Sequence, residues 1–190
     1  MSADLERCME SASKLLPEFS DAWLSAMARY RSTDKEILAE HDDSVAAQNV
    51  RAHMWMEVRR RFNGRPGFTL RRLNGLNLLL YRDEFSWRFK KLDRMGRHSN
   101  YQTKQQRDYD FQLPLPGLPP PATRLTSGYQ LEASGQAIER IIVARPYGRS
   151  VQWDAQVNVV EDVAAWIDIT PRRFAGTEPF QRKKGGEGRR

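Results

Sequence analysis

The sequence predicts an α+β fold in which N-terminal helices pack on an antiparallel sheet of about six strands. Apolar residues recur with a helical period over residues 1–66 and alternate with a period of two after Gly67. The dipeptide Asn74-Gly75 separates two apolar runs and strongly favours a hairpin, because both central positions of its turn need a positive φ. We therefore expect two three-stranded meanders within residues 67–170.

Three helices are expected in the first part of the chain. The first covers residues 4–16 and ends at Pro17, which cannot donate a hydrogen bond inside a helix. The second covers residues 17–31, with the proline in its first turn. The third covers residues 44–62, follows a run of good N-cap residues and ends before Asn63-Gly64. The apolar and aromatic stripes of these helices are typical of a buried core.

The later segments are assigned from alternation and from turn residues. The six expected strands cover residues 68–73, 76–81, 85–92, 125–133, 137–146 and 150–157. Residues 94–111 are polar and predict a loop with one short helix, whereas residues 159–168 predict a short closing helix. The composition of residues 171–190 predicts a basic disordered tail.

Length and composition limit the class of protein. A chain of 190 residues is about one domain, and its one cysteine, Cys8, excludes an intramolecular disulfide and a four-cysteine zinc site. The polar first residues do not resemble a secretory signal, and no apolar run reaches the ~18 residues of a membrane span. These features predict a soluble cytoplasmic protein with no membrane partner and no cofactor.

The positive charge is concentrated in one segment. Residues 57–107 hold 14 basic and 4 acidic side chains, whereas residues 1–56 hold 6 basic and 10 acidic ones. Such a basic block attracts phosphate groups, and it is equally typical of a solvated strand face.

The usual catalytic motifs are absent from the sequence. The nearest approach to a metal-dependent nuclease is Asp83, Glu84 and Lys90, whose spacing does not match the arrangement of two carboxylates and a lysine that such an enzyme needs. The three histidines fall in different predicted elements. We therefore predict no catalytic residue, no metal site and no enzymatic activity.

The stretch QLPLPGLPPP, residues 112–121, is unusual in so charged a chain. Proline fixes φ and removes a donor, so the segment is expected to be extended and exposed. It could be a stiff linker between the two meanders. Its leucines also suit a peptide that docks in a groove of another protein.

Within this stretch, Gln112-Leu113-Pro114-Leu115-Pro116 resembles the peptide by which bacterial replication and repair proteins bind the β sliding clamp. The pattern of that family is Gln-Leu-(Ser/Asp)-Leu-(Phe/Pro), often with a further apolar residue. This chain departs from the pattern by the proline at position 114 and by a glycine before Leu118. The resemblance implies that Gln112 is the polar anchor, that Leu115 and Pro116 fill an apolar pocket, and that Leu113 supports them.

The resemblance also implies a function. Small non-enzymatic proteins with this peptide tend to regulate or inhibit DNA replication by occupying the clamp, and they include toxins of toxin–antitoxin pairs. The implied partners are the β sliding clamp and an antitoxin or adaptor protein.

A nucleic-acid-binding module is the alternative hypothesis. Aromatic and basic residues interleave on the predicted strands, and such a surface can hold single-stranded nucleic acid or DNA by stacking and phosphate contacts. The candidate basic residues are Arg71, Arg72, Arg88, Lys90 and Lys91. Strand alternation places Trp87 and Phe89 opposite Arg88 and Lys90, so the two aromatics are expected in the core and the two basic residues on an outer face.

Overall fold

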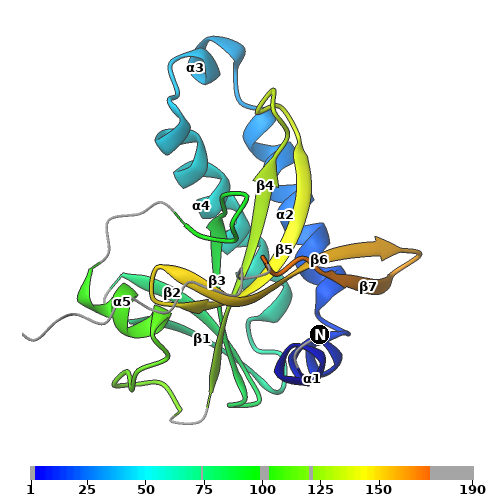
Figure 1. The fold of residues 1–190 in the computed structure, drawn as a ribbon. Helices are drawn as coiled ribbons and strands as arrows, with labels where there is room; N and C mark the ends of the chain where they lie inside the picture. The colour runs from blue at the N-terminus through cyan, green and yellow to red at the C-terminus, as the bar shows by residue number, and fades with distance from the viewer. Residues whose placement is uncertain (1–2, 74, 99–102, 120–121, 172–190) are drawn as a thin grey trace, which may run out of the picture.

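The structure, a computed structural model, describes the chain except for residues 1–2, 74, 99–102, 120–121 and 172–190. It confirms the α+β fold: N-terminal helices pack on a seven-stranded, mostly antiparallel sheet (Figure 1). The predicted disordered tail, residues 171–190, lies outside the described residues except for its first residue.

Four helices form the N-terminal part: α1 (Ala3–Ala12), α2 (Leu16–Arg31), α3 (Lys35–Ala39) and α4 (Asp43–Phe62). The prediction missed α3, which is only five residues long and buries none of them, so it has no apolar stripe. Asp42 caps α4 by accepting a 2.7 Å hydrogen bond from the amide of Val45. Within the described residues, no helix has both the length and the apolar character needed to cross a bilayer.

The strands are β1 (Phe68–Leu73), β2 (Leu76–Tyr81), β3 (Phe85–Lys91), β4 (Thr123–Leu131), β5 (Ile138–Tyr147), β6 (Ser150–Val160) and β7 (Val163–Asp168). They follow one another across the sheet in chain order, and only the β3–β4 pair is parallel. As predicted, β1 and β2 form a hairpin, with Leu73 opposite Leu76. The turn residue Asn74 lies outside the described part, and Gly75 has a φ of 85°.

The predicted closing helix over residues 159–168 is wrong. These residues complete β6 and form β7, and the hairpin turns at Glu161 and Asp162, which both have positive φ. Val163 and Ile167 of β7 are exposed and alternate with half-buried residues, which is the burial period of an edge strand.

The main core lies between the helices and one face of the sheet. Phe19 of α2 packs edge-on against Trp87 of β3, with ring centroids 5.0 Å apart, and Trp23 of α2 packs in a tilted arrangement on Tyr129 of β4, with ring centroids 4.8 Å apart. The indole N–H of Trp23 donates a 3.0 Å hydrogen bond to Ser127. This packing fixes α2 to the middle of the sheet.

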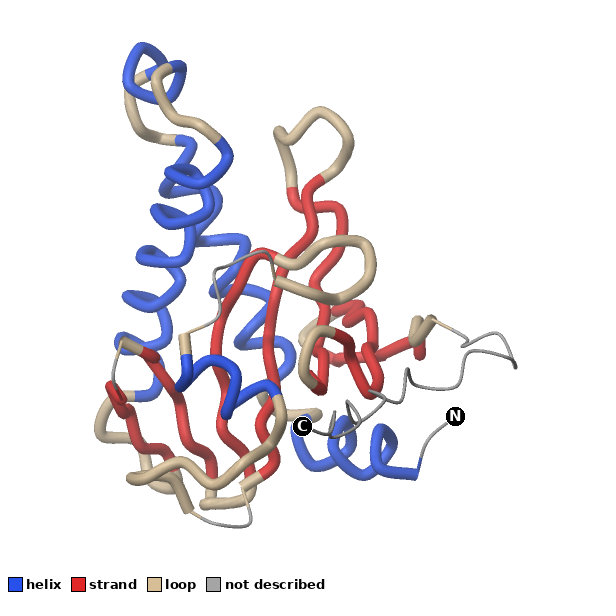
Figure 2. The backbone as a smooth tube through the Cα atoms, turned by 60° about the vertical axis from the view of Figure 1, so that its left-hand side comes forward, coloured by secondary structure: helices blue, strands red, loops and turns tan. Residues whose placement is uncertain are grey.

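The opposite face carries the crossover between the parallel strands. Helix α5 (Lys104–Asp110) lies on this face, on the side away from the long helices (Figure 2). Tyr109 of α5 is fully buried, and its hydroxyl lies 2.6 Å and 2.8 Å from the carbonyl oxygens of Ser86 and Leu125. The crossover is needed because a parallel pair cannot be joined by a tight turn.

Asp154 of β6 is a buried carboxylate in an unfavourable setting. Its side chain is 1% exposed, and its Oδ1 has no hydrogen-bond partner among the described residues. Burial, with the nearby charges of Asp168 and Asp93, raises its pKa to about 6. The folded state therefore favours the protonated form, and stability is lost as pH rises from the ordinary value of 3.8 through about 6.

We expect Asp154→Asn to stabilise the protein at pH 8 by about 1–3 kcal/mol, because it removes a buried charge. At pH 4 the gain should nearly vanish, since the carboxyl is then mostly protonated. Urea unfolding at both pH values measures the difference. The matched control is Asp162→Asn in the exposed β6–β7 turn, which should change stability little at either pH. Equal stability of wild type and Asp154→Asn at pH 8 would contradict the expectation.

Candidate functional site

The predicted basic outer face of β3 is not exposed. Arg88 and Lys90 do face away from Trp87 and Phe89, but they are only 2% and 6% exposed. The prediction was wrong on this point because the crossover covers this face of the sheet. The expectation that Trp87 and Phe89 belong to the core is confirmed.

Arg88 is the centre of a buried polar network. Its Nη2 donates a 2.5 Å hydrogen bond to Oδ1 of Asp110, and its Nε donates a 2.8 Å hydrogen bond to Thr126. The other oxygen of Asp110 lies 3.1 Å from Nε2 of His98. The guanidinium also stacks over the ring of Tyr109, 4.7 Å from its centroid. The carboxylate of Asp110 thus bonds to the charged guanidinium of Arg88 and to the imidazole of His98, which can be protonated.

Lys90 lies beside this network without a hydrogen-bond acceptor. Its Nζ is buried and has no partner among the described residues, and the same holds for Nη1 of Arg88. Burial, with the positive charges of Arg51 and Arg88, lowers the pKa of Lys90 to about 8. Burial likewise lowers the pKa of His98, against the opposing effect of its hydrogen bond to Asp110. The positive charges around Lys90 therefore favour the binding of an anion.

A notch between β2 and β3 leads to Lys90. The ladder between the two strands holds three pairs, which end at Leu79 opposite Trp87, although both strands continue. The notch opens beyond this point, and its cavity has a volume of about 20 Å³, which is room for about one water molecule. It is lined by Arg51, Trp55, Gly75, Leu76, Asn77, Arg88, Phe89 and Lys90.

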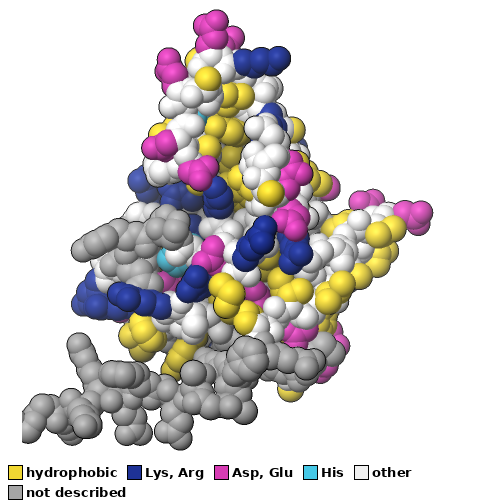
Figure 3. All heavy atoms as spheres, turned by 45° about the horizontal axis from the view of Figure 1, so that its top comes forward, with side chains coloured by type: hydrophobic (Ala, Val, Ile, Leu, Met, Phe, Trp, Pro, Cys, Tyr) yellow, Lys and Arg dark blue, Asp and Glu magenta, His cyan; other side chains and the backbone are white. Residues whose placement is uncertain are grey.

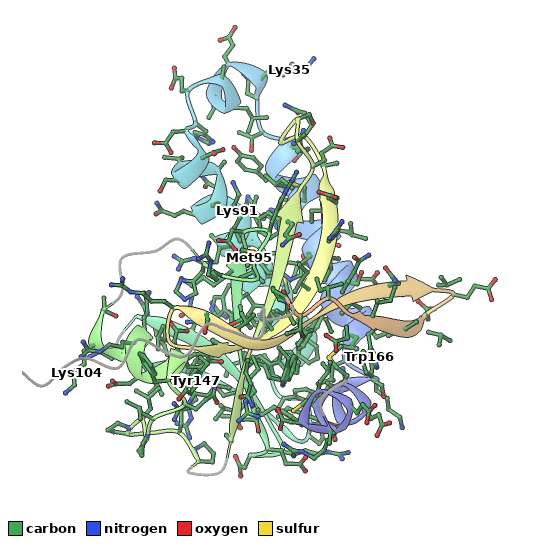
Figure 4. All side chains as sticks on the ribbon, viewed as in Figure 1. Lys35, Lys91, Met95, Lys104, Tyr147 and Trp166 are labelled. Carbon is green, nitrogen blue, oxygen red and sulfur yellow. The ribbon has the colours of Figure 1, made fainter. Side chains whose placement is uncertain are left out.

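Further basic residues lie on the elements near the notch. Arg72 of β1 is exposed and is the strand partner of Asn77, which lines the notch. The side chain of Lys91 is 31% exposed, and its Nζ lies 3.8 Å from Oδ1 of Asp43. Figure 4 shows Lys91 near α4 and Lys104 on α5. In Figure 3, Lys and Arg side chains gather on the left of the face at mid-height and near its centre, and acidic side chains are scattered among them.

Two residues of this site, Arg51 and Trp55, were not predicted from the sequence. Both were assigned to a helix whose aromatic stripe was interpreted only as core. Their spacing held a signal, because Arg51, Trp55 and Arg59 recur every four residues and share one face of α4. Trp55 is half-buried, and its ring centroid lies 6.4 Å from that of Phe89. Of the predicted basic residues, the structure brings Arg88 and Lys90 to the notch, Arg72 to its border, and leaves Arg71 exposed on β1.

The expectation that residues 112–121 form an extended, exposed segment is only partly correct. The described residues of the stretch lack regular secondary structure, as expected, but Gln112 is bound within the fold. Its side-chain amide donates to the carbonyls of Arg124 (3.0 Å) and Pro146 (3.2 Å) and accepts from the amide of Arg124 (2.9 Å). Its φ of 57° places it in the left-handed region just after α5, where glycine is usual.

The apolar residues of the stretch divide into two groups. Leu118 is buried against Leu76, Leu78, Leu80 and Tyr109, and Leu115 packs partly on the same cluster. Leu113 is 48% exposed, and Pro114 and Pro116 are also exposed. The leucine at 118 is therefore a core residue, which the sequence analysis had assigned to an exposed peptide.

The nearest nuclease candidates do not converge. Asp83 and Glu84 precede β3, whereas Lys90 lies near its other end. Among the residues that the structure describes, no three histidine, cysteine, aspartate or glutamate side chains are placed to hold a metal ion. Cys8 is buried in the main core, and burial raises the pKa of its thiol to about 11.

Comparisons with protein-family models, with curated proteins and with solved structures find no match to this chain.

We expect Gln112→Ala to destabilise the protein by about 2 kcal/mol, because it leaves the backbone groups of Arg124 and Pro146 without partners. Urea unfolding measures the loss. The matched control is Leu113→Ala, the next residue, whose exposed side chain should contribute less than about 0.5 kcal/mol. Unchanged stability of Gln112→Ala would mean that the side chain is free to bind another molecule.

Proposed function

We propose that this protein binds single-stranded nucleic acid at the notch between β2 and β3. The observation that carries the proposal is the buried ammonium of Lys90, a residue that lines the notch, because its Nζ has no acceptor among the described residues. A buried charge without a partner is costly, and a phosphate oxygen would satisfy it. A cytoplasmic location, as expected from the sequence, is part of this proposal.

The surroundings of Lys90 support a nucleic acid over a simple anion. Arg51 lines the notch, Arg72 is the strand partner of its lining residue Asn77, and Lys91 follows Lys90 on β3. These basic side chains would contact successive phosphates of one strand. Trp55 is the half-buried aromatic ring of the notch and offers an edge or face for one base.

We expect the affinity for a single-stranded oligonucleotide to fall steeply with salt. Four phosphate contacts would give a slope of about −3 for the logarithm of the association constant against the logarithm of the salt concentration. In the double variant Arg51→Gln, Arg72→Gln, the slope should become shallower by about 1. Fluorescence anisotropy at several salt concentrations measures both slopes.

The matched control for this experiment is Lys14→Gln, which removes an exposed positive charge next to α1. Its slope should equal that of the wild type. A salt slope near zero for the wild type, or equal losses in the control and in the double variant, would refute binding at the notch. The same samples, incubated with Mg²⁺ or Mn²⁺, should contain intact oligonucleotide, because the proposal includes no catalysis.

A second candidate function is binding to the β sliding clamp. The observation that favours it is the exposure of Leu113, Pro114 and Pro116 in a segment without regular structure. These residues lie within the segment that resembles the clamp-binding peptide. Gln112 would have to leave its hydrogen bonds to Arg124 and Pro146 to act as the polar anchor, which lowers the affinity to be expected from this peptide.

For clamp binding we expect Leu113→Ala together with Pro116→Ala to abolish capture by the purified clamp. The two side chains are exposed, so the melting temperature should remain within about 2 °C of the wild-type value. Leu118→Ala is the contrasting variant, because it should lower the melting temperature through loss of core packing. A wild-type protein that the clamp does not retain would exclude this second function.

A further inference from the structure

The hairpin of β6 and β7 carries the most exposed large apolar side chains of the described residues. Val160 and Val163 are 69% exposed and are partners across the hairpin, and Ile167 is 55% exposed. The hairpin projects from the body of the molecule at the end of the sheet (Figure 1). A group of apolar side chains on a projecting element is typical of a contact with another protein.

β7 is also an open edge of the sheet. β6 is its neighbour on one side, and no strand lies beyond it within the described part of the chain. Its ladder to β6 uses alternate residues, up to the amide of Ile169, which donates a 3.1 Å hydrogen bond to the carbonyl of Asp154. The backbone groups of Ala164, Trp166 and Asp168 are therefore directed away from β6. A row of such groups is a template for a further strand.

The two edges of the sheet differ in their protection against a further strand. β1, at the other edge, carries the exposed charged side chains of Arg71 and Arg72, which hinder the addition of a strand. β7 has the sequence VAAWID, without lysine, arginine or proline, and its pairing with β6 runs without a shift of register. β7 is therefore the edge that is suited to accept a strand.

The side chains of β7 limit which strand can pair with it. Asp162 lies in the turn before the strand and Asp168 is its last residue, whereas the residues between them are apolar. Like charges that face each other across a strand pair are destabilising. A suitable partner therefore has an apolar middle and places neutral residues opposite these two carboxylates.

β7 of a second copy meets these conditions when it runs antiparallel about a two-fold axis at Trp166. The opposed residues are then Trp166 and its own copy, Ala164 and Asp168, Ala165 and Ile167, Val163 and Ile169, and Asp162 and Thr170. Neither carboxylate faces another, and the two indoles form an aromatic cross-strand pair. The same register brings the free backbone groups into hydrogen-bonding pairs, because Ala164, Trp166 and Asp168 oppose only one another.

We propose that β7 pairs with β7 of a second copy of this chain, antiparallel and about a two-fold axis at Trp166, so that the two sheets become one. The contact is closed, because both copies use the same edge. It consists of one strand pair and its side chains, and an interface of this size is typical of a weak, reversible dimer.

Sedimentation equilibrium of the full chain tests the proposal. We expect the average mass to rise from that of one chain toward that of two as concentration increases. In the double variant Val163→Lys, Ile167→Lys the dissociation constant should rise about tenfold or more, because the added lysines of the two copies lie close together across the axis. Both replaced side chains are exposed, so the melting temperature of dilute samples should fall by less than about 4 °C.

The matched control is Leu24→Lys together with Ile37→Lys, which adds the same charge on α2 and α3. These side chains are 52% and 49% exposed, similar to Ile167. The control should dimerise as the wild type does. Equal weakening in the two double variants would overturn pairing through β7, because the loss would then follow from net charge alone.

Cysteine variants test the register. An equimolar mixture of Ala165→Cys and Ile167→Cys should form an interchain disulfide under mild oxidation, because directly opposed residues lie within disulfide reach. Ala165→Cys alone should cross-link much more slowly, and the native Cys8 is buried. Fast cross-linking of Ala165→Cys alone, or none in the mixture, would contradict the register.

The size distribution separates the other possible occupants of the edge. A wild type that stays a single chain at every concentration would overturn the dimer. If the chain without residues 172–190 then dimerises, the segment that follows β7 is the occupant in place of a second copy. Oligomers larger than a dimer would indicate head-to-tail pairing of β7 with β1 and would overturn the two-fold contact.

Discussion

The buried ion pair between Arg88 and Asp110 holds the crossover of this fold in place. Arg88 lies on β3 and Asp110 ends α5, so the pair joins the sheet to the segment that connects its two halves. Both side chains are nearly inaccessible to water, and loss of one partner of such a pair typically costs about 3–5 kcal/mol. Tyr109 and Gln112, on either side of Asp110 in sequence, add hydrogen bonds to strand backbones.

This constraint explains the burial of both faces of β3. One face packs on the aromatic core of the helices, and the other is covered by α5 and the segment that follows it. The crossover also allows β3 and β4 to be parallel, which joins a three-stranded and a four-stranded antiparallel part into one sheet. The stability of the sheet and the position of Lys90 therefore depend on the same contacts.

The candidate site is a consequence of incomplete strand pairing. β2 remains with β1 while β3 remains with β4, and the two pairs separate beyond Leu79 and Trp87. The buried Lys90 lines the resulting notch, together with Arg51 and Trp55 of α4. A site formed in this way needs residues from three elements that are far apart in sequence. It is stiff, because each wall belongs to a continuous ladder.

The sequence by itself determined the class of fold, the hairpin at Asn74-Gly75 and the aromatic core, because helical and strand periods are local patterns. It also identified Arg88 and Lys90 as candidate ligand residues from their charge. Only the tertiary structure decided that these two side chains are buried, that Gln112 bonds to Arg124 and Pro146, and that residues 159–168 complete a hairpin. The physical reason is that burial of a strand's outer face depends on a crossover of some thirty residues, whose path no local pattern specifies.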